Sequence, residues 1–115
     1  MNTRRCNGTF DDHRNTVKQR EAIPYVVVVQ PSLYDRYRRR VVIPLVRRRN
    51  PDSSSDFESL PLNPVFRIEG VEVVLHPLEI VSVALDQLGD KVASLAQEGD
   101  CITCAMDELL TRAWA

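Results

Sequence analysis

Two cysteines, Cys101 and Cys104, stand three residues apart in the stretch CITC. At the start of a helix, the helix dipole would lower the pKa of such a thiol and favour redox chemistry. Cysteines at this spacing also serve as small packing residues, and the flanking sequence lacks a thioredoxin-like strand–helix–strand pattern. A zinc site would need two further ligands from Cys6, His13 or His76, at spacings that match no familiar zinc finger. Redox or metal function stays a minor alternative, and we expect no metal and no cofactor.

The two histidines belong to no recognisable catalytic set. His76 precedes Pro77 at the end of an expected strand, which is more typical of a turn than of a general base. No serine, cysteine or pair of carboxylates forms a triad-like set with either histidine in the sequence. A Gly-rich phosphate loop and an H-E-x-x-H motif are also absent from the sequence. We therefore expect a binding protein and not an enzyme.

A cluster of arginines with interleaved tyrosines could contact phosphates and stack on bases. The tyrosines are Tyr34 and Tyr37, and the arginines are Arg36, Arg38, Arg39 and Arg40. A solvated loop of charge is the alternative. Residues 47–49 are a second arginine run, about 20 Å away if the seven intervening residues are extended. One compact patch that reads DNA is hard to build from both runs, so we expect no sequence-specific binding of nucleic acid.

Charge is distributed unevenly along the chain. Residues 1–50 hold twelve Lys or Arg against four Asp or Glu, and residues 51–115 hold three against twelve, so that +8 and −9 give the net charge of −1. Such asymmetry points to contact with nucleic acid or with an acidic partner. Neutralisation of one half by the other, within the chain or across a dimer, is an equally good explanation.

Composition favours a single globular domain over residues 1–115. Hydrophobic residues make up 43% and charged residues 27% of the 115 residues, and no apolar run approaches the roughly 18 residues of a membrane helix. The first residues lack the apolar middle of a signal peptide. Three cysteines, an odd number, suit a reducing compartment, and we expect a cytoplasmic protein.

The middle of the chain predicts antiparallel β-structure. Strands are expected at 24–31, at 40–46, on both sides of the turn Glu69-Gly70 within 65–77, near 79–84 and, after a turn at 88–90, near 91–96. Pro44 cannot donate a ladder hydrogen bond, which places its strand at a sheet edge or at a bulge. Residues 1–9 are expected to form a loose leader and residues 47–64 a surface loop.

The end of the chain changes to a helical period. Asp100 can cap a helix, and apolar residues then recur at steps of three and four: Ile102, Ala105, Met106, Leu109, Leu110 and Ala113. One amphipathic helix is therefore expected to pack on the sheet.

The stretches PYVVVVQPSLYD, RVVIPLV, LNPVFRIEGVEVVL and VASLAQEGDCITCAMDELLT, in this order, resemble the CcdB family over residues 10–111. Members of this family are toxins of toxin–antitoxin modules that poison DNA gyrase. The resemblance implies an SH3-like β-barrel of the CcdB/MazF type with one C-terminal helix, assembled as a homodimer. It also implies binding to the gyrase A subunit through Leu33 and Tyr34 and through the helix end at Asp107, Leu110 and Thr111.

The tail LLTRAWA departs from the family pattern of an aromatic residue or Thr, then Gly, then an apolar residue. In an ungapped alignment Thr111 takes the aromatic position and Arg112 replaces the Gly. In an alignment anchored at the terminus Trp114 is the stacking aromatic and Ala115 replaces the Gly. Residues 112–115, which are Arg112, Ala113, Trp114 and Ala115, therefore join the expected gyrase-binding set.

The resemblance further implies a CcdA-like antitoxin whose acidic segment wraps over the toxin. Residues 41–46 are then a buried barrel strand, and the arginines at its ends, with Arg36, Arg38, Arg39 and Arg40 as candidates, would meet that antitoxin. Two alternatives stay open. The chain could be a relative that only binds an antitoxin, or an endoribonuclease, because the MazF and Kid toxins share this barrel.

Overall fold

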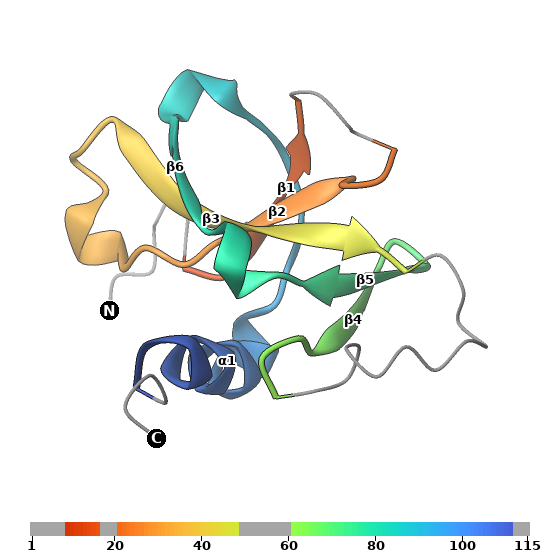
Figure 1. Cartoon of the computed structure of the whole chain (residues 1–115). Coiled ribbons are helices and arrows are strands. Elements are labelled where there is room, and N and C mark those ends of the chain that lie inside the picture. Colours follow the sequence, from red (N-terminus) through yellow and green to blue (C-terminus); the bar gives the residue numbers. More distant parts are fainter. Residues whose placement is uncertain (1–8, 17–20, 49–60, 112–115) are drawn as a thin grey trace.

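The computed structural model of the chain describes residues 9–16, 21–48 and 61–111. These residues form one antiparallel sheet, four short 3-10 turns and one helix (Figure 1). The strands are β1 (Asp11–Asn15), β2 (Tyr25–Val28), β3 (Arg39–Arg47), β4 (Val65–Ile68), β5 (Val71–Leu75), β6 (Val81–Ala84) and β7 (Leu88–Ser94), and the helix is α1 (Gly99–Thr111). No helix in this described part is long and apolar enough to cross a membrane.

The sheet has the order β4-β5-β3-β2-β1-β7, with β6 paired to β3 beside this path. It curls into a half-barrel, and α1 lies below it in Figure 1. The predicted fold class, a mainly β SH3-like barrel with one C-terminal helix, is confirmed. The strand predicted at 40–46 runs from Arg39 to Arg47, so the loop predicted for 47–64 begins later; residues 49–60 of that loop, and residues 1–8 of the predicted leader, lie outside the described residues.

Pro44 lies in the central strand, so the prediction of a sheet edge or bulge was wrong. On one side of β3, Val26 of β2 is the partner of Pro44. On the other side the partner changes along the strand, from β6 at Arg39–Val42 to β5 at Leu45–Arg47. Pro44 lies at this change, where its carbonyl accepts a bond of 3.2 Å from the His76 N–H. The missing proline donor therefore leaves no strand partner unsatisfied.

The core lies between the sheet and α1. Val27, Ile43, Leu45 and Leu75 are fully buried on the sheet, and Ile102 of α1 is fully buried against them. Burying one such aliphatic side chain contributes about 1.5–3 kcal/mol. The predicted helical period is confirmed for Ile102, Ala105 and Met106, while Leu110 is exposed. The helix begins at Gly99, so Asp100 lies in its first turn, where the dipole favours a carboxylate.

Gly70 and Gly89 are needed for two different structural reasons. Glu69 and Gly70 both have positive φ, 54° and 78°, which confirms the tight hairpin turn predicted between β4 and β5. The turn predicted at 88–90 was wrong, because these residues belong to β7. Gly89 instead allows β1 to approach closely, since a Cβ there would clash with the Arg14 carbonyl oxygen.

Strand β1 carries a buried carboxyl group that makes no hydrogen bond. Asp12 lies between Val27 of β2 and Ala93 of β7, and its side chain is fully buried. Neither carboxylate oxygen has a hydrogen-bond partner among the described residues. The pKa of Asp12 is raised from 3.8 to about 7, chiefly by burial and also by the neighbouring Asp11 carboxylate, while Lys91 opposes the shift. Asp12 is thus mostly protonated in the folded protein below neutral pH and about half ionised near pH 7.

We predict that Asp12 makes stability fall as pH rises from about 4 to about 7. In this range the unfolded state releases the proton while the folded state keeps it, so ionisation favours unfolding by up to about 4 kcal/mol above pH 7. Replacement of Asp12 by Val should remove this loss. Urea unfolding of both proteins at pH 4.5 and pH 8 measures it, with Asp86→Asn, at an exposed carboxylate, as the matched control. Parallel pH profiles for the native protein and the Asp12→Val variant would contradict the prediction.

Candidate functional site

The segment between β2 and β3 is a series of tight turns. Its 3-10 turn η1 spans Ser32–Tyr34, and successive backbone bonds of 3.0–3.1 Å join Tyr34 to Pro31, Asp35 to Ser32 and Tyr37 to Tyr34. Gln30 fastens this segment to the sheet. Its side-chain oxygen accepts from the Val41 N–H at 3.1 Å, and its side-chain nitrogen donates to the Tyr34 carbonyl at 3.1 Å. The segment is therefore held by β3.

Arg40 holds the same segment from inside. Its side chain is 3% exposed, and its guanidinium donates to the carbonyls of Tyr37 at 2.7 Å, Arg39 at 3.0 Å and Asp35 at 3.1 Å. The Asp35 carboxylate lies 3.8 Å away as counter-charge. Sequence reasoning grouped Arg40 with the surface arginines, but its burial gives it a structural position instead.

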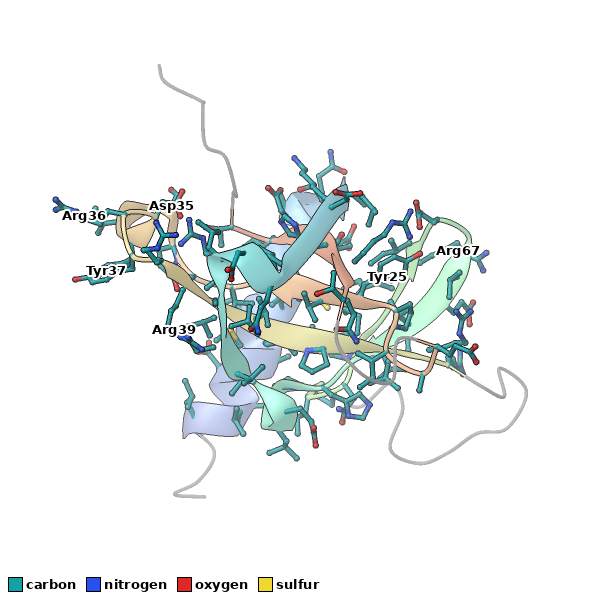
Figure 2. All side chains as sticks on the ribbon, turned by 90° about the horizontal axis from the view of Figure 1, so that it is seen from above. Tyr25, Asp35, Arg36, Tyr37, Arg39 and Arg67 are labelled. Carbon is teal, nitrogen blue, oxygen red and sulfur yellow. The ribbon has the colours of Figure 1, made fainter. Side chains whose placement is uncertain are left out.

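The other three arginines of this cluster differ in whether their side chains are bound within the chain. Arg39 is tied to β6, because Nε donates to Ser82 Oγ and Nη2 to the Ser82 carbonyl, both at 2.8 Å. Arg36 and Arg38 are exposed and form no ion pair within the described ranges. Figure 2 shows Arg36 and Tyr37 projecting from one end of the molecule, away from Arg67 at the other end. Two of the four predicted arginines are thus available to a partner.

A groove borders this segment, and we call it the tyrosine groove. Its volume is about 610 Å³, and it is lined by Val29, Gln30, Pro31, Tyr34, Tyr37, Arg38, Arg39 and Val41. The rings of Tyr34 and Tyr37 have centroids 6.2 Å apart and are tilted by 39°. Leu33 precedes Tyr34 on η1 and is 77% exposed. Sequence reasoning identified the tyrosines but not the two valines, which looked like ordinary strand residues.

The end of α1 is the second predicted contact region. Asp107 and Leu110 are exposed, Leu110 by 64%, and Thr111 ends the helix. Arg112, Ala113, Trp114 and Ala115 lie outside the described residues. In both figures the C-terminal end of α1 and the η1 segment lie toward the same side of the molecule. One partner surface could therefore reach both regions.

More exposed apolar side chains lie on the turn η2 and in the residues that follow it. The turn η2 (Pro77–Glu79) contacts α1 and leads into β6. Leu78 is 68%, Ile80 37% and Val81 49% exposed. Large apolar side chains gathered in this way are typical of protein interfaces.

Ion pairs join the basic first half of the chain to the acidic second half. Arg14 pairs with Glu69 at 3.0 Å and Arg48 with Glu72 at 3.2 Å. The opposite combination, Asp11 with Lys91, lies at 3.5 Å. Part of the charge asymmetry is thus neutralised within one chain, while Arg36 and Arg38 are exposed and without an ion pair among the described residues.

Groups with catalytic potential are scattered. His13 is buried, and its Nδ1 lies 2.8 Å from the Gly89 carbonyl oxygen. Cys101 and Cys104 are exposed and free. Burial, then Glu98 and Cys104, raise the pKa of the Cys101 thiol, the reverse of the shift that redox chemistry favours. Within the described ranges no three His, Cys, Asp or Glu side chains are grouped to hold a metal ion.

A profile of the CcdB protein family matches residues 9–111. The chain belongs to the CcdB family. This assignment covers nearly the whole sequence and makes the chain a relative of the toxins of toxin–antitoxin modules. No curated protein sequence matches it.

The CcdB-like fold also resembles a solved endoribonuclease in complex with its cognate antitoxin from a mycobacterial species. The TM-score is 0.70, the identity is 14%, and the match covers 90% of this chain and 94% of that one. At this identity the likeness establishes the fold alone.

We predict that Arg40 and Arg36 differ sharply in their effect on stability. Arg40→Ala removes the donor to three carbonyls and leaves a cavity, and should cost about 1–3 kcal/mol of unfolding free energy. It should also speed amide exchange between Ser32 and Tyr37. Arg36→Ala, the matched control, should change stability by less than about 0.5 kcal/mol. Urea titration and hydrogen exchange decide the matter, and equal effects of the two substitutions would contradict the assigned role of Arg40.

Proposed function

We propose that the chain is the toxin of a type II toxin–antitoxin system, and that it binds the DNA gyrase A subunit and traps gyrase with cleaved DNA. The observation that carries this proposal is the match of the CcdB family over residues 9–111. On this proposal the chain acts by binding a protein and not as an enzyme. Its target places its action in the cytoplasm.

The proposed gyrase contacts are the η1 segment and the end of α1. They comprise Leu33, Tyr34, Asp107, Leu110, Thr111, Arg112, Ala113, Trp114 and Ala115. Leu33 and Leu110 are exposed, which supports this choice. When a partner buries large apolar side chains, their removal from water contributes favourable hydrophobic free energy to binding. The shared side of the molecule on which both regions lie supports it as well.

The active form is proposed to be a homodimer. Leu78 lies on η2, which contacts α1, and Ile80 and Val81 follow it in the chain; all three are exposed and offer apolar surface that a second copy could cover. Burial of such a surface is the usual driving force for association of identical subunits.

A CcdA-like antitoxin is proposed to neutralise the toxin. Arg36 and Arg38 are exposed and have no ion pair among the described residues, which suits an acidic segment. The mycobacterial structure of similar fold was solved in complex with its antitoxin, which supports a partner of this kind.

Endoribonuclease activity is the second candidate, because the protein of similar fold is an endoribonuclease. Such an enzyme needs an acid and a base near a cation that stabilises the phosphate. Here His13 is 4% exposed and Arg40 is 2% exposed, so these two residues cannot reach an RNA strand without rearrangement. The exposed Arg36 and Arg38 could contact its phosphates, so this candidate is decided by experiment.

We predict that the purified protein with gyrase, ATP and supercoiled plasmid accumulates linear DNA. Removal of residues 112–115 should reduce the amount of linear DNA at least tenfold. Leu33→Glu should reduce it to a similar extent, because each change removes a proposed contact with gyrase. Arg67→Ala, at the far end of the molecule, is the matched control and should leave the product unchanged. Gel electrophoresis after protein digestion measures the linear fraction.

Two outcomes would contradict gyrase poisoning. Absence of linear DNA at high protein concentration, together with normal growth of a host that expresses the chain without an antitoxin, would favour a relative that only binds an antitoxin. Cleavage of a defined RNA by the same preparation would favour the endoribonuclease.

A further inference from the structure

Two thiols near the start of α1 face water and take no part in the proposed contacts with gyrase. Cys101 and Cys104 are both exposed and free. They lie in the first half of α1, which begins at Gly99. The neighbouring Ile102 and Ala105 are fully buried and hold this part of the helix on the sheet. The two thiols are therefore accessible to small molecules on a helix whose position the core fixes.

The spacing of the two cysteines suits a disulfide bond. In an α-helix, the Cα atoms of residues three apart lie about 5 Å from each other, and disulfides join Cα atoms about 4.4–6.8 Å apart. The Cβ atoms of such a helical pair lie about 5–6 Å apart, whereas a disulfide needs about 3.5–4.5 Å. The backbone of α1 therefore permits the bond once the two Cβ atoms approach each other by about 1–2 Å.

The start of α1 is the part of the helix where this approach costs least. The turn η4 (Ala96–Glu98) leads directly into α1 and has 3-10 geometry. In 3-10 geometry, side chains three residues apart are eclipsed, which brings their Cβ atoms closer together. The first N–H groups of a helix have no intrahelical acceptor, so tightening of this region breaks few hydrogen bonds. A 3-10 conformation continued toward Cys104 would bring the two thiols together.

The thiol chemistry suits a slow modification and not a redox catalyst. Burial raises the pKa of the Cys101 thiol, and Glu98 and Cys104 raise it as well. The effect of Cys104 on Cys101 indicates that the two groups are close neighbours. A raised thiol pKa leaves little thiolate at neutral pH, so the pair reacts slowly. The same property makes Cys101 a poor leaving group, so a disulfide that contains it is also cleaved slowly at the Cys104 sulfur.

We propose that Cys101 and Cys104 are a reversible modification site, which a low-molecular-weight disulfide of the glutathione class oxidises to an intrachain disulfide. One protein thiol loses its proton and attacks a sulfur of glutathione disulfide, whose S–S bond breaks and releases one glutathione as a thiolate that takes up a proton. The second protein thiol loses its proton and attacks the protein sulfur of this mixed disulfide, which releases the second glutathione. Two hydrogen atoms thus pass from the chain to two glutathione molecules.

The bond is a local modification of the helix surface. It closes a ring of the four residues 101–104, and so short a ring constrains the unfolded chain little. Oxidation should therefore leave the urea midpoint of the chain almost unchanged. The site is independent of gyrase and of any antitoxin.

The experiment uses the full-length chain with Cys6→Ser, so that only the two helix thiols remain. After incubation with glutathione disulfide, the intact mass should fall by two hydrogen atoms, with no glutathione attached. Titration with a thiol reagent should find both thiols lost, and dithiothreitol should restore them. The reaction should run at least about tenfold faster at pH 8.5 than at pH 6.5, because the thiolate is the nucleophile.

A spacing variant is the matched control. Cys104→Ser combined with Thr103→Cys, in the same Cys6→Ser chain, keeps two exposed thiols but places them two residues apart. Residues at this spacing do not face each other on a helix. The variant should form the intrachain disulfide at least about tenfold more slowly and should accumulate glutathione adducts instead.

Three outcomes would overturn the proposal. The chain with the native spacing could carry only glutathione adducts, or could form disulfides only between molecules, which a non-reducing gel reveals. The spacing variant could also close as fast as the native spacing, which would mean that the helix does not bring the thiols together. Gyrase enters none of these measurements, so their failure would leave the proposed function standing, and absent poisoning would leave the dithiol site standing.

Discussion

The structure depends on how the nine-residue strand β3 pairs with other strands along its two edges. Strand β3 pairs with β2 along one side and must divide the other side between β6 and β5. Pro44, which has no N–H, lies where this division occurs, and the Pro44 carbonyl is still paired with His76. A single partner strand running along this whole side of β3 would face Pro44, which has no N–H to donate. The proline therefore favours a sheet in which β6 and β5 pair with different parts of β3. The half-barrel curl follows, because the two partner strands need not lie in one plane.

The same strand connects the fold to the candidate site. At its beginning, Arg40 donates to two carbonyls of the preceding segment and to that of Arg39, and Arg39 binds Ser82 of β6. Val41 completes its ladder through the side chain of Gln30. These bonds hold η1 against the barrel with Leu33, Tyr34 and Tyr37 in water. Exposure of these apolar groups is costly for an isolated chain, and it becomes favourable when a partner covers them.

Much of the fold could be predicted from local sequence patterns. Runs of β-branched residues identify β2 and β3, a Glu-Gly pair with positive φ marks the hairpin, and the three- and four-residue steps after Asp100 identify α1. Strand β1 was not predicted, because Asp11–Asn15 is entirely polar or charged and its burial arises only once β2 and β7 flank it. The role of Gly89 was misassigned for the same reason, since its neighbour Arg14 comes from β1. Among the site residues, charge alone suggested that Arg40 is exposed. Its burial depends on carbonyls that turn inward only after the segment folds.

The central claim is that a gyrase-binding surface is carried by the segment that β3 holds. Site-specific photocrosslinking tests it most directly, with a benzophenone amino acid placed at Leu33 in one protein and at Arg67 in another. After irradiation with the purified gyrase A subunit, the account predicts a crosslinked species from position 33 and none from position 67. A crosslink from position 67 without one from position 33 would contradict it.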